Sequence, residues 1–104
     1  MTKIVTSADF EATIASGVTL VDMYADWCGP CQRLAPIVED LASDYEGKAN
    51  ICKLNVDDSN DIATKFGVMS IPTILIFKDG KLVEKAVGLQ EKEHLASLLD
   101  KHLA

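Results

Sequence analysis

The feature that most constrains the fold is an apolar run at residues 19–25 that is interrupted by one carboxylate, Asp22. A strand that is covered on both faces is apolar almost throughout, whereas a half-exposed strand alternates with polar residues. The run therefore predicts a central strand buried between two layers. Residues 50–56 predict a second buried strand, and the segment between the two has helical spacing. Such a strand-helix-strand unit predicts two parallel strands with a right-handed crossover.

Periodicity and turn residues predict the rest of an α/β pattern. We expect a strand at residues 3–6, helices at 7–15, 28–45 and 57–66, strands at 73–78 and 81–87, and a closing helix that contains Leu95 and Leu103. Ser7 is the expected cap of the first helix and Gln90 a weaker cap of the last. Asp79-Gly80 predicts a type I′ turn, so the last two strands form an antiparallel hairpin.

Length and charge limit the domain count and the partners. A chain of 104 residues with 48% hydrophobic composition can build one core, so we expect a single domain at residues 1–104. The formal net charge of −6 argues against nucleic-acid binding and against a polybasic membrane contact. We expect a monomer with neither kind of partner.

The cysteine count and the first residues indicate the compartment. Three cysteines, an odd number, fit a reducing environment better than a disulfide-stapled secreted domain. Residues 1–20 contain no apolar stretch of signal-peptide length. Both observations predict a cytoplasmic protein.

Two cysteines stand at the junction between the central strand and the next helix, in Trp27-Cys28-Gly29-Pro30-Cys31. A disulfide across so short a loop adds little chain-entropy stabilisation, which favours reversible redox chemistry over a structural bridge. At a helix N-terminus the backbone N–H groups and the positive dipole end favour the Cys28 thiolate. A zinc site is the competing interpretation, but it needs four ligands and the sequence offers no second cysteine pair.

Asp22 is the candidate base for this dithiol. Burial in an apolar strand should raise its pKa and suit it to take the proton of Cys31. The alternative is a solvated carboxylate on an edge strand. Lys53, on the neighbouring predicted strand, is either its partner or a surface lysine. Cys52 is expected to be an inert buried thiol, and His94 and His102 are expected to be surface residues.

The chain resembles the thioredoxin family over almost its whole length. The matching pieces are Val21-Asp22, Trp27-Cys28-Gly29-Pro30-Cys31, Ala35-Pro36, Lys53-Leu54-Asn55-Val56-Asp57, Ile71-Pro72-Thr73, Phe77-Lys78-Asp79-Gly80 and Gly88. The resemblance implies a mixed five-stranded sheet flanked by four helices in the order βαβαβαββα. It also implies a protein-disulfide reductase that needs no cofactor beyond its own dithiol, and that is recycled by thioredoxin reductase, an NADPH-dependent flavoprotein.

Residue roles follow from the same resemblance. Cys28 would attack the disulfide of a target protein and Cys31 would resolve the mixed disulfide. Gly29-Pro30 contains no histidine, which points to a reductant rather than an oxidant. Ile71-Pro72 would be a cis-proline loop that pairs with the target backbone.

An apolar groove beside Cys28 is also implied, and its expected lining is Trp27, Val56, Ile71, Gly88 and Leu89. The alternative for Trp27 is a place in the core. Three departures from the family pattern concern partner choice: Gln32 after the second cysteine, Met23-Tyr24 ahead of the motif, and Met69-Ser70 before Ile71. The competing function is a structural or regulatory subunit that keeps the fold as a rigid binding scaffold, with redox chemistry incidental, although a scaffold has no need of Asp22 inside a strand.

Overall fold

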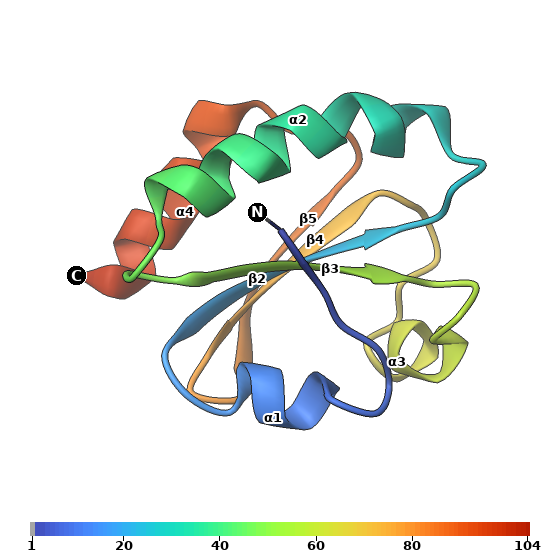
Figure 1. Ribbon diagram of the computed structural model, residues 1–104, viewed down its shortest axis with the longest axis horizontal. Coiled ribbons are helices and arrows are strands. Elements are labelled where there is room, and N and C mark those ends of the chain that lie inside the picture. Colours follow the sequence, from blue (N-terminus) through green and yellow to red (C-terminus); the bar gives the residue numbers. More distant parts are fainter. Residues whose placement is uncertain (1) are drawn as a thin grey trace.

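The computed structural model describes residues 2–104, and in that range it contains five strands and four helices around one sheet. The elements are β1 (Lys3–Ile4), α1 (Phe10–Ile14), β2 (Val18–Tyr24), α2 (Gly29–Asp44), β3 (Asn50–Asn55), α3 (Asn60–Lys65), β4 (Thr73–Lys78), β5 (Lys81–Val87) and α4 (Lys92–Leu103). Helices α2 and α4 cover one face of the sheet, and α1 and α3 lie on the other (Figure 1). The fold implied by the resemblance is confirmed.

The strand order, β1-β3-β2-β4-β5, decides which loops meet. Strands β1, β3 and β2 are parallel, β4 is antiparallel to β2, and β5 is antiparallel to β4. The carboxyl ends of β2, β3 and β5 therefore lie at the same edge of the sheet as the amino end of β4. The loops that carry Cys28, Val56, Pro72 and Gly88 come together at that edge.

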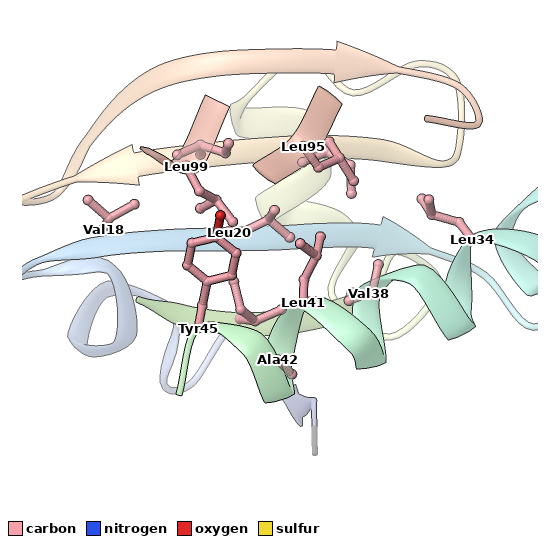
Figure 2. Packing of buried hydrophobic residues seen from close by; sticks show 12 residues of the cluster. Val18, Leu20, Leu34, Val38, Leu41, Ala42, Tyr45, Leu95 and Leu99 are labelled. Carbon is pink, nitrogen blue, oxygen red and sulfur yellow. The ribbon is translucent and has the colours of Figure 1, made fainter. Parts of the chain in front are cut away.

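Alternate residues of β2 serve different layers. Val18 and Leu20 pack on Leu41 of α2 and Leu99 of α4, together with Tyr45, the C-cap of α2 (Figure 2). Val21 and Met23 pack on the other face with the residues of α1 and α3. Both sets are almost completely buried, which explains why the strand reads as a continuous apolar run.

The aromatic residues of the second face fix α1 and α3 against the sheet. The rings of Phe10, Phe66 and Phe77 contact one another with centroids 5.2–5.6 Å apart. Two of these contacts are edge-to-face, the arrangement that the ring quadrupoles favour.

The hairpin of β4 and β5 has the expected turn and one irregularity. Asp79 and Gly80 both have positive φ, 50° and 85°, as a type I′ turn requires. Ile76 pairs with Glu84 and Phe77 pairs with Leu82, so Val83 is an extra residue that forms a β-bulge in β5.

Two predicted helix caps are wrong. Helix α1 begins at Phe10 with Asp9 before it, and the Ser7 hydroxyl instead donates to Asp61 across to α3. The residue that precedes α4 is Glu91, while the Gln90 side chain donates to the Val87 carbonyl, 3.0 Å away. Ser7 thus bonds a tertiary partner and Gln90 a nearby backbone carbonyl, and neither bonds the adjacent helix end.

His102 also departs from prediction, whereas His94 is exposed as expected. The His102 side chain is only 16% exposed, and its Nε2 lies 2.7 Å from Glu84 Oε2 on β5. This contact joins the end of α4 to the outer strand.

Among the helices of residues 2–104, none is both long and apolar enough to cross a membrane.

Candidate active site

Cys28 and Cys31 form a disulfide at the amino end of α2, with their Cα atoms 5.2 Å apart. Cys28 is the N-cap of the helix, in an extended conformation, and its Sγ accepts a hydrogen bond from the Cys31 N–H at 3.2 Å. The Cys28 N–H in turn donates to the Ala25 carbonyl, 3.2 Å away, which fixes the turn between β2 and α2. Pro30 stands in the first helical turn, where its missing N–H costs nothing. The helix N-terminus therefore points at the Cys28 sulfur, as the sequence predicts.

The loop before β4 lies directly against this sulfur. The Ile71–Pro72 peptide bond is cis, and Cys28 Sγ is 3.7 Å from the Ile71 carbonyl oxygen. The Gly88 N–H donates to the Pro72 carbonyl at 2.8 Å, which ties the loop after β5 to the same place. Segments more than 40 residues apart in the chain thus converge on Cys28.

Apolar side chains surround this convergence. Trp27 is 72% exposed, so the alternative that placed it in the core is wrong. Its Nε1–H donates to Asp57 Oδ2 at 2.9 Å. Leu89 is 48% exposed, whereas Val56 and Ile71 are half-buried and pack against the cysteines. Val56 and Ile71 thus lie beside Cys28, and the Gly88 N–H holds the loop after β5 against Pro72; we call this surface beside Cys28 the rim.

Two further residues lie close in the chain to those of the rim. Asp57 follows β3 and orients the indole of Trp27 through the hydrogen bond given above. Met69 is 96% exposed and stands two residues before Ile71. Met69 stands out in the sequence only as a departure from the family pattern, and no local pattern links Asp57 to an indole 30 residues away.

Asp22 is buried below the cysteines, on the α2 side of the central strand, and is only 2% exposed. Within residues 2–104, its Oδ1 has no hydrogen-bond partner. Burial raises the pKa of Asp22 from its ordinary value of 3.8 to about 7, and the positive charge of Lys53 opposes part of that rise. Since β2 is the middle strand of the sheet, the alternative of a solvated carboxylate on an edge strand is wrong.

A pocket of about 190 Å³ connects Asp22 with the second cysteine. Its lining consists of Asp22, Tyr24, Ala25, Asp26, Cys31, Gln32, Ala35, Val38 and Lys53. One water takes up about 30 Å³ of liquid volume, so the pocket has room for a water that bridges a carboxylate and a thiol. A larger pocket, of about 480 Å³, is lined by residues such as Ser16, Gly47 and Asn50 and contains none of the site residues.

Lys53 stands beside Asp22 but its ammonium is directed elsewhere. The two residues are register partners on β3 and β2. Lys53 Nζ lies over the Tyr24 ring, 5.4 Å from its centroid, and no ion pair between Lys53 and Asp22 is formed in the described chain. The lysine is half-buried, so it is neither a plain surface residue nor a direct salt-bridge partner.

Cys52 behaves as the sequence predicts. It is 1% exposed, its Sγ donates to the Leu20 carbonyl at 3.3 Å, and burial raises the pKa of its thiol to about 12. A thiol in this state is almost entirely protonated at neutral pH and cannot attack an electrophile.

We therefore expect iodoacetamide to modify the reduced native protein at Cys28 and Cys31 and to leave Cys52 unmodified. Unfolding in guanidinium chloride should make the third thiol reactive at once. Mass spectrometry of the intact chain counts the adducts. Three adducts on the native protein at neutral pH would show that the Cys52 site opens readily.

Within residues 2–104, no group of three or more His, Cys, Asp or Glu side chains is arranged to hold a metal ion. The arrangement of the two cysteines, the helix cap and the buried carboxyl suits thiol-disulfide exchange.

Comparison with known proteins agrees with this chemistry. The sequence model of the Thioredoxin family matches residues 1–101. The chain is 60% identical over 99 residues to thioredoxins of Staphylococcus aureus strains Mu50 and MW2, and the match covers 95% of each chain. A mutant thioredoxin from Halobacterium salinarum superposes with a TM-score of 0.91 at 38% identity, over 98% of this chain and 90% of that one. The chain therefore belongs to the thioredoxin family and is a protein-disulfide reductase that works through its own Cys28–Cys31 dithiol without a bound cofactor.

Proposed function

We propose that Cys28 and Cys31 carry out the two successive steps of target reduction. The Cys28 thiolate attacks one sulfur of the target disulfide, the target S–S bond breaks, and the other target sulfur leaves as a thiolate. The Cys31 thiolate then attacks Cys28 Sγ and releases the second target sulfur. The target gains two electrons and two protons, and the protein ends with the Cys28–Cys31 disulfide.

The position of Cys28 Sγ carries this assignment. It is the sulfur that accepts the N–H of Cys31 at the helix end, and it is the one that lies beside the Ile71 carbonyl at the apolar rim. A helix N-terminus stabilises negative charge on that atom. Cys31 lies on the inner side, where it lines the pocket that contains Asp22.

Asp22 is the proposed base for the second step. A carboxyl whose pKa is about 7 holds and releases protons at neutral pH, which is the condition for efficient general base catalysis. The shared pocket allows a water to carry the Cys31 proton to Asp22. Lys53 is the proposed electrostatic partner that limits the cost of the ionised carboxylate. A redox-inactive scaffold would gain nothing from this buried acid.

The rim is the proposed binding surface for the target. An extended target segment would pair with the backbone around Ile71 and Pro72, as in strand addition at a sheet edge. The residues that contact it would be Trp27, Gly29, Pro30, Val56, Ile71, Gly88 and Leu89. Apolar contact with a wide range of sequences fits a reductant with many targets.

The proposed cellular setting is the cytoplasm, where the chain acts as a monomeric electron carrier. An NADPH-dependent thioredoxin reductase would reduce the Cys28–Cys31 disulfide after each cycle and so sustain redox homeostasis. The odd cysteine count and the thioredoxin relatives support this setting. We propose that residues 1–104 work as one domain, without nucleic acid or membrane as a partner.

Reduction of insulin tests the proposed cycle. With dithiothreitol, and then with NADPH and a thioredoxin reductase, the protein should accelerate precipitation of the insulin B chain and consume NADPH in proportion to the disulfides reduced. The matched control is the same protein after alkylation of its two reactive thiols. Activity with dithiothreitol but none with several reductases would reject the proposed recycling partner, and no activity in either assay would reject the reductase cycle.

A further inference from the structure

The side chains of Tyr24, Lys53 and Asp22 form a group in which the reaction described above gives no role to Tyr24. Asp22 and Tyr24 are two residues apart on β2, so they project from the same face of the sheet. Lys53 is the register partner of Asp22 on the adjacent strand. All three line the pocket that also contains Cys31.

Two groups compete for the Lys53 ammonium. One is the Tyr24 ring, over which Nζ lies at 5.4 Å from the centroid. The other is the Asp22 carboxyl, whose Oδ1 has no hydrogen-bond partner in the part of the chain that the structure describes. An ammonium directed at the carboxyl would have to enter a pocket whose walls include Ala35 and Val38. When the Lys53 ammonium lies over the Tyr24 ring, it stays at the half-exposed mouth of the pocket and keeps much of its hydration.

We propose that Tyr24 is a positioning residue for disulfide reduction, because its ring holds the Lys53 ammonium at the pocket mouth and leaves the Asp22 oxygen free to receive the proton of Cys31. This inference rests on the role of Asp22 proposed above. It assigns a function to Tyr24, one of the positions at which the chain departs from its family.

Other charges near this group are the same in every variant considered. Asp26 and Asp58 lie near enough to the Tyr24 hydroxyl to raise its pKa, although burial contributes more. Glu39, on α2, is within electrostatic range of Lys53. Asp22 is the register partner of Lys53 and lines the same pocket, which also contains Asp26, so we expect the ammonium to turn to Asp22 once the ring is gone. Loss of the ring should therefore bring Lys53 toward Asp22 and lower the pKa of that carboxyl.

The test is a pH titration of the Asp22 side-chain carboxyl carbon by NMR in the oxidised full-length protein. Tyr24→Phe keeps the ring and should leave the midpoint where the wild type has it. Tyr24→Leu removes the ring and should lower the midpoint by about half a pH unit, the size expected for a partly exposed cation–π contact. In a Lys53→Met background, Tyr24→Leu should produce no such fall.

Two results would overturn the inference. One is an unchanged or raised midpoint in Tyr24→Leu; the other is a fall of equal size in the Lys53→Met background, which would assign the change to altered burial. The pH profile of Cys31 attack on a preformed mixed disulfide separates this question from the base itself. If Asp22→Asn left that profile unchanged, the role of Asp22 as base would fail, and with it the role of Tyr24 in the reaction, even where the titration showed that the ring holds Lys53.

Discussion

Cys28→Ser is expected to abolish reduction of target disulfides, whereas Cys31→Ser is expected to attack a target once and remain joined to it. The first variant lacks the sulfur that the helix end activates. The second retains that sulfur but has no thiol to resolve the mixed disulfide. The loss of multiple turnover should be complete in both, so turnover alone cannot distinguish the two roles.

Trapping distinguishes them. Each variant is incubated with a disulfide-containing protein, and covalent complexes are detected by non-reducing electrophoresis and mass spectrometry. Both variants should also be prepared with Cys52→Ala, so that Cys28 or Cys31 is the only thiol left. Capture by Cys28→Ser in place of Cys31→Ser would reverse the two assignments.

Asp22→Ala is expected to give a more stable but slower protein at neutral pH. The folded-state pKa of about 7 lies above the ordinary value of 3.8, and each pH unit between them is worth about 1.4 kcal/mol. Ionised Asp22 therefore costs the folded state roughly 4 kcal/mol at pH 8, and alanine removes this cost. The loss of the proposed base should slow the attack by Cys31.

The pKa values of Asp22 in the unfolded and folded states set the direction in which the free energy of unfolding changes with pH. Below about pH 3.8 both states hold the proton, and ionisation of Asp22 contributes nothing. Between 3.8 and about 7 the unfolded chain has lost the proton that the folded protein keeps, so the free energy of unfolding falls as the pH rises. Above about 7 the penalty is constant.

Guanidinium chloride unfolding of both proteins from pH 4 to pH 8 measures this difference. The stability gain of Asp22→Ala should grow through that range. Asp22→Asn, which keeps the size and polarity of the side chain, is the matched control for the small cavity that alanine leaves. A midpoint for Asp22→Ala that is equal to or below the wild type at pH 8 would show that the carboxylate is fully compensated.

Sequence patterns predicted the features that depend on many residues at once. The central strand was predictable because each of its two faces packs in a separate hydrophobic core, which requires an apolar residue at nearly every position. Asp22 stood out against that background, and its burial follows from the position of β2 in the sheet. The hairpin was equally clear, since few dipeptides other than Asp79-Gly80 accept two successive positive φ angles.

Features that depend on a single tertiary contact could not be predicted. Ser7 has the chemistry of a helix cap, but Asp61 offers it a better partner from a segment that is distant in the chain. His102 looked like a surface residue because Glu84 approaches it only through the packing of α4 on β5. Strand alternation placed Lys53 beside Asp22. The rotamer that carries the Lys53 ammonium over Tyr24 depends on the competition between the Tyr24 ring and the Asp22 carboxyl for that ammonium. No pattern of residue spacing encodes such choices.

The bulge at Val83 bears on how the protein behaves when it is concentrated. Strand β5 is the long outer edge of the sheet, and its Leu82 and Val87 are partly exposed. A flat edge of this kind would be a template on which a second molecule could add its own strand. The extra residue twists the edge and breaks its hydrogen-bonding repeat, and the lysines at 81 and 85 oppose the approach of an identical edge in register. We expect this edge to resist strand addition by a second molecule when the protein is concentrated.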